Sequence, residues 1–135
     1  MAHSIQVFGE KSAILRDHVY AVIIVLAREV IFRTPRFEGF QQMAQQWEHA
    51  ILYGVGMVDL KLEEWIRTEE EKQKYVELFD AIGDEAHRFG ATIPGAFINE
   101  RLPANSGWDF EEVDTEQILN GATELRGLIS ESSAV

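Results

Sequence analysis

The sequence contains no cysteine, and it has only 12 basic side chains against 23 acidic ones, a formal net charge of −11 over 135 residues. The absence of cysteine excludes a disulfide scaffold, a thiolate zinc site, an iron–sulfur cluster and a cysteine nucleophile, and it fits a reducing compartment. The shortage of lysine and arginine argues against nucleic acid and against an anionic membrane surface as partners, because both attract basic proteins. The partner that this charge favours is a basic protein.

Long apolar runs are also missing. The longest, residues 19–27, has nine residues, whereas a membrane-spanning helix needs about 20. The first residues lack the basic, apolar and small-residue order of a secretory signal. Hydrophobic residues nevertheless make up 46% of the chain. We therefore expect a soluble, cytoplasmic protein that folds as a single helical domain over residues 1–135.

Apolar side chains recur at helical spacing in four long segments, which are residues 12–33, 37–53, 69–89 and 115–130. The first segment is apolar around most of its circumference, which is typical of a helix in the centre of a fold. Thr68 and Asp114 are suitable N-cap residues for the last two segments. The pattern predicts an all-α, or mainly α, single-domain bundle of about four to five helices, with helix 12–33 in the centre.

Two segments are harder to assign. In residues 57–66, alternation of apolar and polar side chains favours a strand, whereas Trp65 and Ile66 break the alternation and favour a short helix, which we prefer. Residues 91–114 contain most of the remaining proline and glycine. They predict an ordered loop with one helical turn after Pro94. The predicted core consists of Leu15, Val19, Ile23, Leu26, Phe40, Trp47, Leu78, Phe79, Ile82, Leu125 and Ile129.

A search for catalytic motifs finds no phosphate-binding loop, no dinucleotide-binding glycine motif and no serine nucleophile elbow. Helical bundles that bind metals use two Glu-x-x-His pairs on facing helices. The sequence has one comparable spacing, Asp84-x-x-His87, without a second copy. We therefore expect no catalytic residue, no metal and no cofactor. A carboxylate- or metal-dependent enzyme is the alternative that 23 acidic residues keep open.

The segment 108–116 combines five acidic residues with two aromatic ones and contains no basic residue. At protein interfaces, aromatic side chains act as buried anchors, and a charged rim steers a partner of opposite charge. This pattern predicts a partner-binding surface made of Trp108, Asp109, Phe110, Glu111, Glu112, Asp114 and Glu116. A second acidic cluster, residues 63–71, is explained by the favourable position of carboxylates at the start of a helix.

These features favour a small acidic inhibitor that binds another protein. In size and charge the chain is similar to bacterial toxin-immunity proteins, although no motif identifies one of their families. Such a protein would neutralise a basic toxin or nuclease by covering its active site or surface. The alternatives are an adaptor or regulatory subunit of a larger complex, and a helical bundle that binds a small molecule. The sequence leaves the partner's identity and the oligomeric state open.

Overall fold

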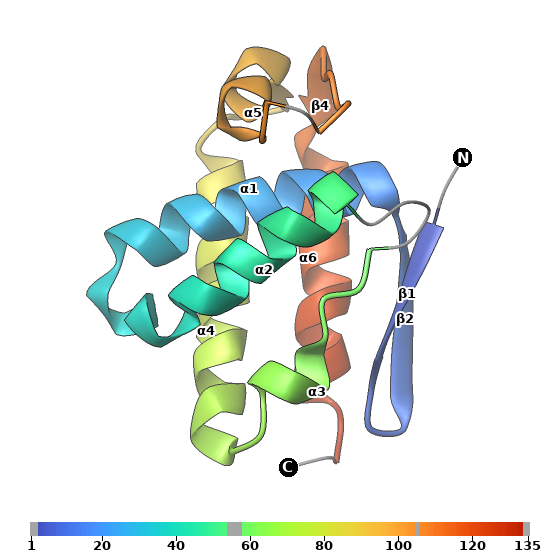
Figure 1. The fold of residues 1–135 in the computed structure, drawn as a ribbon, viewed down its shortest axis with the longest axis vertical. Coiled ribbons are helices and arrows are strands. Elements are labelled where there is room, and N and C mark those ends of the chain that lie inside the picture. Colours follow the sequence, from blue (N-terminus) through green and yellow to red (C-terminus); the bar gives the residue numbers. More distant parts are fainter. Residues whose placement is uncertain (1–2, 54–57, 105, 134–135) are drawn as a thin grey trace.

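A computed structural model of the chain describes residues 3–53, 58–104 and 106–133. The chain is mostly helical, as predicted, but it also contains two small antiparallel sheets of two strands each, which an all-α fold lacks (Figure 1). The elements in chain order are β1 (His3–Phe8), β2 (Lys11–Arg16), α1 (Asp17–Arg33), the 3₁₀ helix η1 (Pro35–Phe40), α2 (Gln41–Tyr53), α3 (Leu62–Trp65), α4 (Glu69–His87), β3 (Thr92–Pro94), α5 (Gly95–Arg101), β4 (Glu112–Asp114) and α6 (Thr115–Ser130).

The chain starts with a hairpin that the sequence analysis did not predict. Strands β1 and β2 pair with Ile5 opposite Ile14, and a two-residue turn connects them. Gly9 has φ of 59°, which suits the first central position of a type II′ turn. The predicted helix 12–33 is therefore wrong at its N-terminal end, because residues 11–16 form β2 and α1 begins at Asp17. The helical spacing of Leu15 and Val19 was misleading, and Leu15 is only half-buried.

Helix α1 occupies the centre of the fold, as predicted. All of residues 19–27 are buried, and α1 lies across the antiparallel pair α4 and α6, with α2 beside it (Figure 1). Gly121 allows α6 to approach α1 closely, since a Cβ atom there would lie 2.7 Å from Val19 Cγ1. Apart from Leu15, every residue of the predicted core is buried.

The other helices follow the prediction with shifted boundaries. The segment predicted as helix 37–53 starts as η1, where Pro35 occupies the first turn, and α2 begins only at Gln41. In the segment 57–66, residue 57 lies outside the described residues, residues 58–61 are not helical and α3 is a short helix. Helices α4 and α6 are confirmed. Thr68 accepts a hydrogen bond from the Glu71 N–H at 3.1 Å, and Asp114 accepts one from the Glu116 N–H at 3.1 Å.

Residues 91–114 are more regular than the predicted loop. The helical turn expected after Pro94 is α5, and the strands β3 and β4 pair on either side of it. Each strand has three residues, which is too short for an alternating pattern to be recognised. Thr115 N–H donates to the Ala91 carbonyl at 3.1 Å and extends this pairing to the start of α6.

The tip of the N-terminal hairpin contacts the residues that follow α6. Ser133 N–H donates to Glu10 at 2.8 Å, and the Ser132 hydroxyl donates to the Phe8 carbonyl at 3.4 Å. Lys72 of α4 also donates to the Ser132 carbonyl at 2.8 Å. These bonds hold the hairpin against the end of α6. In the described part of the chain, no helix combines the length and the apolar composition that crossing a bilayer requires.

Candidate interaction surfaces

The predicted partner-binding segment 108–116 lies at one end of the molecule, where β4 and the residues before it pack beside α5 (Figure 1). Asn99 of α5 fixes its position. The Phe110 N–H donates to Asn99 Oδ1 at 2.8 Å, and Asn99 Nδ2 donates to the Phe110 carbonyl at 2.8 Å and to Asp109 at 3.2 Å. One amide side chain therefore satisfies both backbone groups of Phe110.

A close backbone contact adds to this fixation. A Cβ atom on Gly95 would lie 1.8 Å from the Glu111 carbonyl oxygen and 2.0 Å from the Phe110 carbonyl oxygen. The absence of a side chain therefore lets the acidic segment lie directly on the first residue of α5. The segment is an ordered surface rather than a free loop.

The two aromatic side chains of the segment stack on each other. The rings of Trp108 and Phe110 are nearly parallel, at 12°, with centroids 5.8 Å apart. Both residues are half-buried and pack against the edge of the core. Trp108 therefore anchors the segment to the protein while part of the residue stays exposed to solvent.

All five acidic side chains of the segment are exposed. The alternation of β4 turns Val113 inward, and it turns Glu112 and Asp114 outward. In the part of the chain that the structure describes, none of Asp109, Glu111, Glu112, Asp114 and Glu116 forms an ion pair with a lysine or arginine. The structure thus brings the seven predicted residues together as one surface with five uncompensated negative charges.

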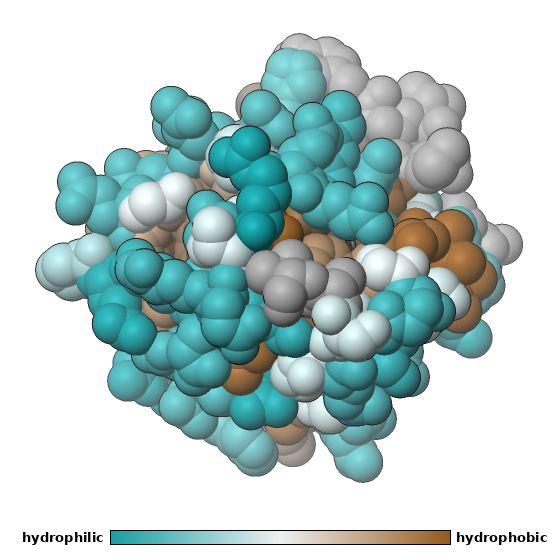
Figure 2. All heavy atoms as spheres, turned by 90° about the horizontal axis from the view of Figure 1, so that it is seen from below, coloured by the Kyte–Doolittle hydropathy of each residue, from teal (hydrophilic) through white to brown (hydrophobic). Residues whose placement is uncertain are grey.

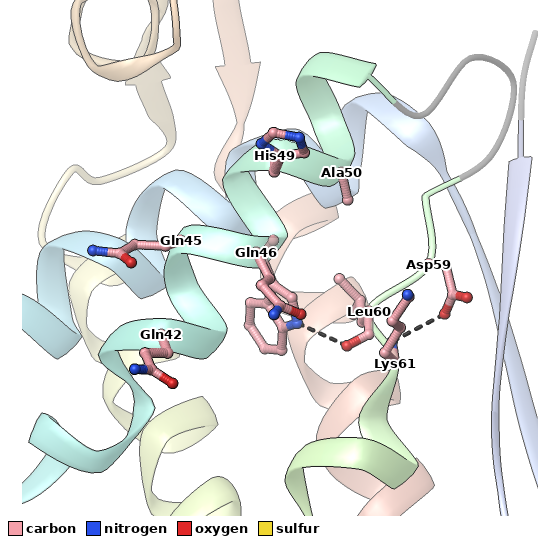
Figure 3. Close-up of a pocket in the computed structure, with 9 residues that line it drawn as sticks. Gln42, Gln45, Gln46, His49, Ala50, Asp59, Leu60 and Lys61 are labelled. Atoms are coloured by element: carbon pink, nitrogen blue, oxygen red, sulfur yellow. Dashed lines mark hydrogen bonds between the residues drawn. The ribbon is translucent and has the colours of Figure 1, made fainter.

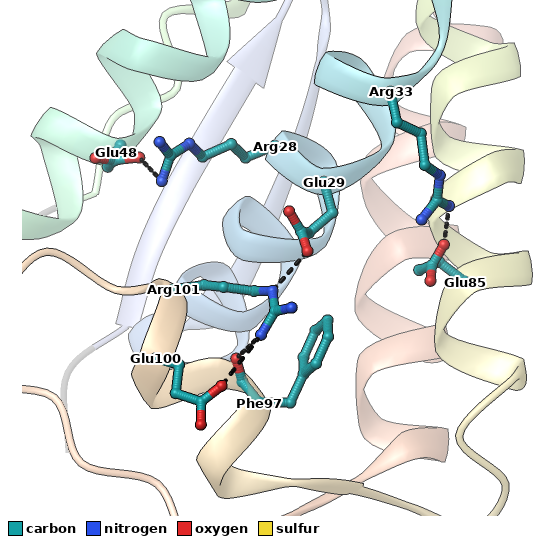
Figure 4. A network of polar contacts seen from close by, with 8 residues as sticks. All are labelled: Arg28, Glu29, Arg33, Glu48, Glu85, Phe97, Glu100 and Arg101. Atoms are coloured by element: carbon teal, nitrogen blue, oxygen red, sulfur yellow. Dashed lines mark hydrogen bonds and ion pairs between the residues drawn. The ribbon is translucent and has the colours of Figure 1, made fainter.

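Several arginines pair with acids outside this segment, and three of them lie on α1 and α5 (Figure 4). Arg28 of α1 binds Glu48 of α2 at 2.9 Å, and Arg33 of α1 binds Glu85 of α4. Arg101 of α5 binds Glu29 of α1 at 2.5 Å and lies 3.7 Å from the centroid of the Phe97 ring. These pairs connect α1 to α2, α4 and α5. The acidic side chains in excess of the basic ones lie elsewhere on the surface.

The N-terminal hairpin provides a second candidate surface, which sequence reasoning missed. Strand β1 buries the polar Ser4 and Gln6 together with Phe8, whereas Ile5, Val7 and Ile14 are 54%, 53% and 59% exposed. Figure 2 shows hydrophobic side chains gathered on the side of the molecule where Figure 1 places the hairpin. The alternation of polar and apolar residues over 4–7 was the signal that could have indicated β1.

Hydrogen bonds explain why polar residues point inward from β1. Gln6 Nε2 donates to the Val58 carbonyl at 2.7 Å, and Gln6 Oε1 accepts from the Leu60 N–H at 3.0 Å. Ser4 Oγ accepts from the Val58 N–H at 2.8 Å and donates to the buried Asp17 carboxylate at 2.6 Å. None of the described strands pairs with residues 58–60, so the side chains of Ser4 and Gln6 bind backbone groups of Val58 and Leu60 instead.

A polar groove of about 660 Å³ lies between α2 and residues 59–61 (Figure 3). Gln42, Gln45 and Gln46 line it from α2, opposite Asp59 and Lys61. Trp47 is buried at its base and donates its indole N–H to the Leu60 carbonyl at 2.9 Å. Small-molecule sites are mostly apolar and enclosed, so this open, amide-lined groove gives little support to the small-molecule alternative.

Metal ligands do not converge in the part of the chain that the structure describes, where no group of three or more histidine, aspartate or glutamate side chains could hold an ion. Asp84 and His87, the nearest match to a metal motif, are both exposed on α4. Comparison of the chain with protein-family models, with curated proteins and with solved structures finds no match in any of the three.

Proposed function

We propose that this chain is an acidic protein-binding inhibitor of the immunity type, which neutralises a basic toxin or nuclease by covering its active site or surface. The observation that carries this proposal is the uncompensated negative charge of the segment 108–116. Five exposed carboxylates on a short stretch repel one another in the free chain. A cationic partner surface removes this repulsion and gains attraction.

The way the segment is held supports the same function. Asn99 and Gly95 fix its backbone, and a binding surface that is ordered before association loses less conformational entropy on binding. The Trp108–Phe110 stack lies among the carboxylates and supplies partly exposed aromatic area. Tryptophan is among the residues that contribute most to binding at interfaces.

The charge also fits a nuclease as the target. A surface that binds nucleic acid is rich in lysine and arginine, because it must neutralise phosphates. The carboxylates of the segment 108–116 present anionic oxygens to such a surface, and they attract it over a distance of about 10 Å at 0.1 M salt. An inhibitor of this kind associates quickly and occupies the site of the substrate.

An adaptor or regulatory subunit is the second candidate function. One observation favours it: the exposed apolar face of the hairpin lies on a different element from the acidic segment. A protein with two separate contact surfaces can join two partners. Both candidate functions, inhibitor and adaptor, use the charge of the segment 108–116 to bind a partner. The first experiment therefore tests that segment.

The experiment measures binding of the purified chain to the basic protein that co-purifies with it from its native cell, at two salt concentrations. Glu111→Lys with Glu112→Lys is expected to slow association, because rim charges act at long range. This effect shrinks as salt rises. Trp108→Ala is expected to accelerate dissociation and to cost about 2 kcal/mol or more.

The control carries the same charge change elsewhere. Glu38 and Glu69 are exposed and lie on η1 and at the start of α4, so Glu38→Lys with Glu69→Lys tests net charge alone. An association rate that falls equally in both double variants would show that overall charge, not this segment, guides the partner. Unchanged binding of the Glu111/Glu112 variant at low salt would contradict the proposal.

A further inference from the structure

The outward face of the hairpin is a contiguous apolar patch. Ile5 and Ile14 are directly opposite in the strand register, and Val7 follows Ile5 on the same face of β1. The face ends at the open end of the hairpin, where His3 is opposite Arg16. Antiparallel sheets usually turn such side chains toward the core. Here the inner face uses Ser4 and Gln6 to bind residues 58–60, and Ile5, Val7 and Ile14 of the outward face lie in water.

Acidic grooves border this patch on both sides. On the side of β1, a groove of about 380 Å³ is lined by Asp59, Glu63 and Glu64 together with Lys61. On the side of β2, a groove of about 480 Å³ is lined by Glu124 and Glu131 together with Lys11. Each lysine already faces one of these acids, since Lys61 lies 4.0 Å from Glu64 and Lys11 lies 4.0 Å from Glu131. Both grooves therefore keep a net negative charge.

Helix α6 connects the hairpin to the acidic segment described above. Glu116, Glu124 and Glu131 are exposed and separated by eight and seven residues, a spacing that places them on one face of the helix. Glu116 belongs to the segment 108–116, and Glu131 lines the groove beside β2. An acidic stripe thus runs along α6 from one surface to the other.

We propose that the outward face of the β1–β2 hairpin, with the acidic grooves beside it, is a docking surface for a basic partner that carries an apolar stripe edged by lysine or arginine side chains. This inference rests on the proposed function, because the partner is the same basic protein. It adds a second area of contact to the segment 108–116. The apolar stripe would cover Ile5, Val7 and Ile14, and the cationic edges would enter the two grooves.

The charges favour such a partner over a second copy of this chain. A two-fold dimer brings a patch against the same patch of the other copy. The acids that border the hairpin would then lie close to those of the other copy, and they outnumber the basic side chains there, which are Lys11, Lys61 and Arg16. Mutual repulsion between two chains of net charge −11 acts in the same direction.

The test uses a synthetic peptide in which lysine and valine alternate, and a control peptide in which glutamate replaces lysine. Amide resonances of the isotope-labelled chain are followed as each peptide is added. We expect the lysine peptide to shift residues of β1, β2 and the exposed face of α6, and the glutamate peptide to shift none of them.

The variant Ile5→Thr with Ile14→Thr removes apolar surface while it keeps β-branched side chains that suit a strand. It is expected to bind the lysine peptide about tenfold more weakly, which corresponds to about 1.4 kcal/mol. Phe32→Gln is the matched control, because Phe32 is an exposed apolar residue on α1. This control should bind the peptide as the parent chain does.

The outcomes separate the two proposals. If Ile5→Thr with Ile14→Thr binds the native partner and the peptide as the parent does, while Glu111→Lys with Glu112→Lys loses the partner, the docking inference is wrong and the proposed function stands. If the hairpin variant loses the native partner and the Glu111/Glu112 variant does not, the hairpin is the binding surface and the segment 108–116 is not. The molar mass of the free chain in solution tests a third possibility. If the parent chain becomes a dimer as its concentration rises and the hairpin variant stays a monomer, the hairpin face binds a second copy of this chain, and the docking inference is wrong.

Discussion

At the scale of single residues, Gly95 shows how one position controls the candidate surface. Its Cα lies against two carbonyl groups of the acidic segment, and backbone atoms, unlike the end of a flexible side chain, cannot move alone. Asn99, one turn further along α5, completes the contact with its amide. The position of five carboxylates therefore depends on a residue without a side chain and on one amide.

We predict that Gly95→Ala destabilises the protein by about 1–3 kcal/mol, the usual cost of overpacking a close contact. The segment 108–116 would also shift, because the alanine methyl group displaces the carbonyls of Phe110 and Glu111. Urea unfolding measures the loss. Gly39→Ala is the control, since a Cβ atom on Gly39 meets nothing within 4 Å. Equal stabilities of the two variants would show that the contact is looser than described.

At the scale of elements, the hairpin and residues 58–60 depend on each other. The Gln6 amide makes the two hydrogen bonds that a neighbouring strand would make in a sheet. It donates to the Val58 carbonyl and accepts from the Leu60 N–H. This explains why two polar residues, Ser4 and Gln6, lie beside the buried Phe8 on the face of β1 that packs inward. It also explains why Ile5 and Val7, which alternate with Ser4 and Gln6 along β1, face outward.

We predict that Gln6→Ala costs about 1–3 kcal/mol for each of the two buried backbone groups that it leaves without a partner. Denaturant unfolding of the variant measures this loss. Gln42→Ala provides the comparison, because Gln42 lies on the solvent-facing side of α2 and lines the polar groove. A Gln6 variant as stable as the Gln42 variant would mean that water replaces the amide at no cost.

The sequence predicted well those elements whose pattern and cap residues lie within one continuous segment. Helix α4 has a continuous apolar stripe and a Thr68 cap, and α6 has the Asp114 cap, so both could be located closely. Strand β2 could not be located, because Leu15 continues the helical spacing of α1 and because β2 is a strand only through its pairing with β1. The acidic segment was identified from composition alone, whereas the hairpin surface required knowledge of which face of β1 is buried. That face is set by residues more than 50 positions away.

At the scale of the whole molecule, ionisable groups link stability to pH. Burial raises the pKa of Tyr75 well above its ordinary value of 10, and burial also raises the pKa of Tyr20. The unfolded chain therefore loses these protons at a lower pH than the folded chain. The stabilisation is complete below about pH 10 and is lost as the pH rises toward the pKa values of the folded protein.

We predict that the melting temperature falls as the pH rises above about 10, and that Tyr75→Phe falls less steeply than the parent chain. Near neutral pH the variant should be nearly as stable as the parent, because the Tyr75 hydroxyl makes only a 3.4 Å hydrogen bond to the Leu125 carbonyl. The lysines are the same in both proteins, so the difference between the two slopes isolates the tyrosine. Identical slopes would contradict the prediction.

The contact between the hairpin tip and residues 132–133 has a consequence for the order of events on the ribosome. Translation produces the hairpin before Ser132 and Ser133, which are more than 120 residues further along the chain. The hairpin strands therefore leave the exit tunnel long before the groups that bind their tip have been made. During that interval Ile5, Val7 and Ile14 are accessible on a ribbon that is not yet fixed in place. The two strands are consequently an apolar segment that chaperones, or neighbouring chains on a polysome, can reach before the tip is bound.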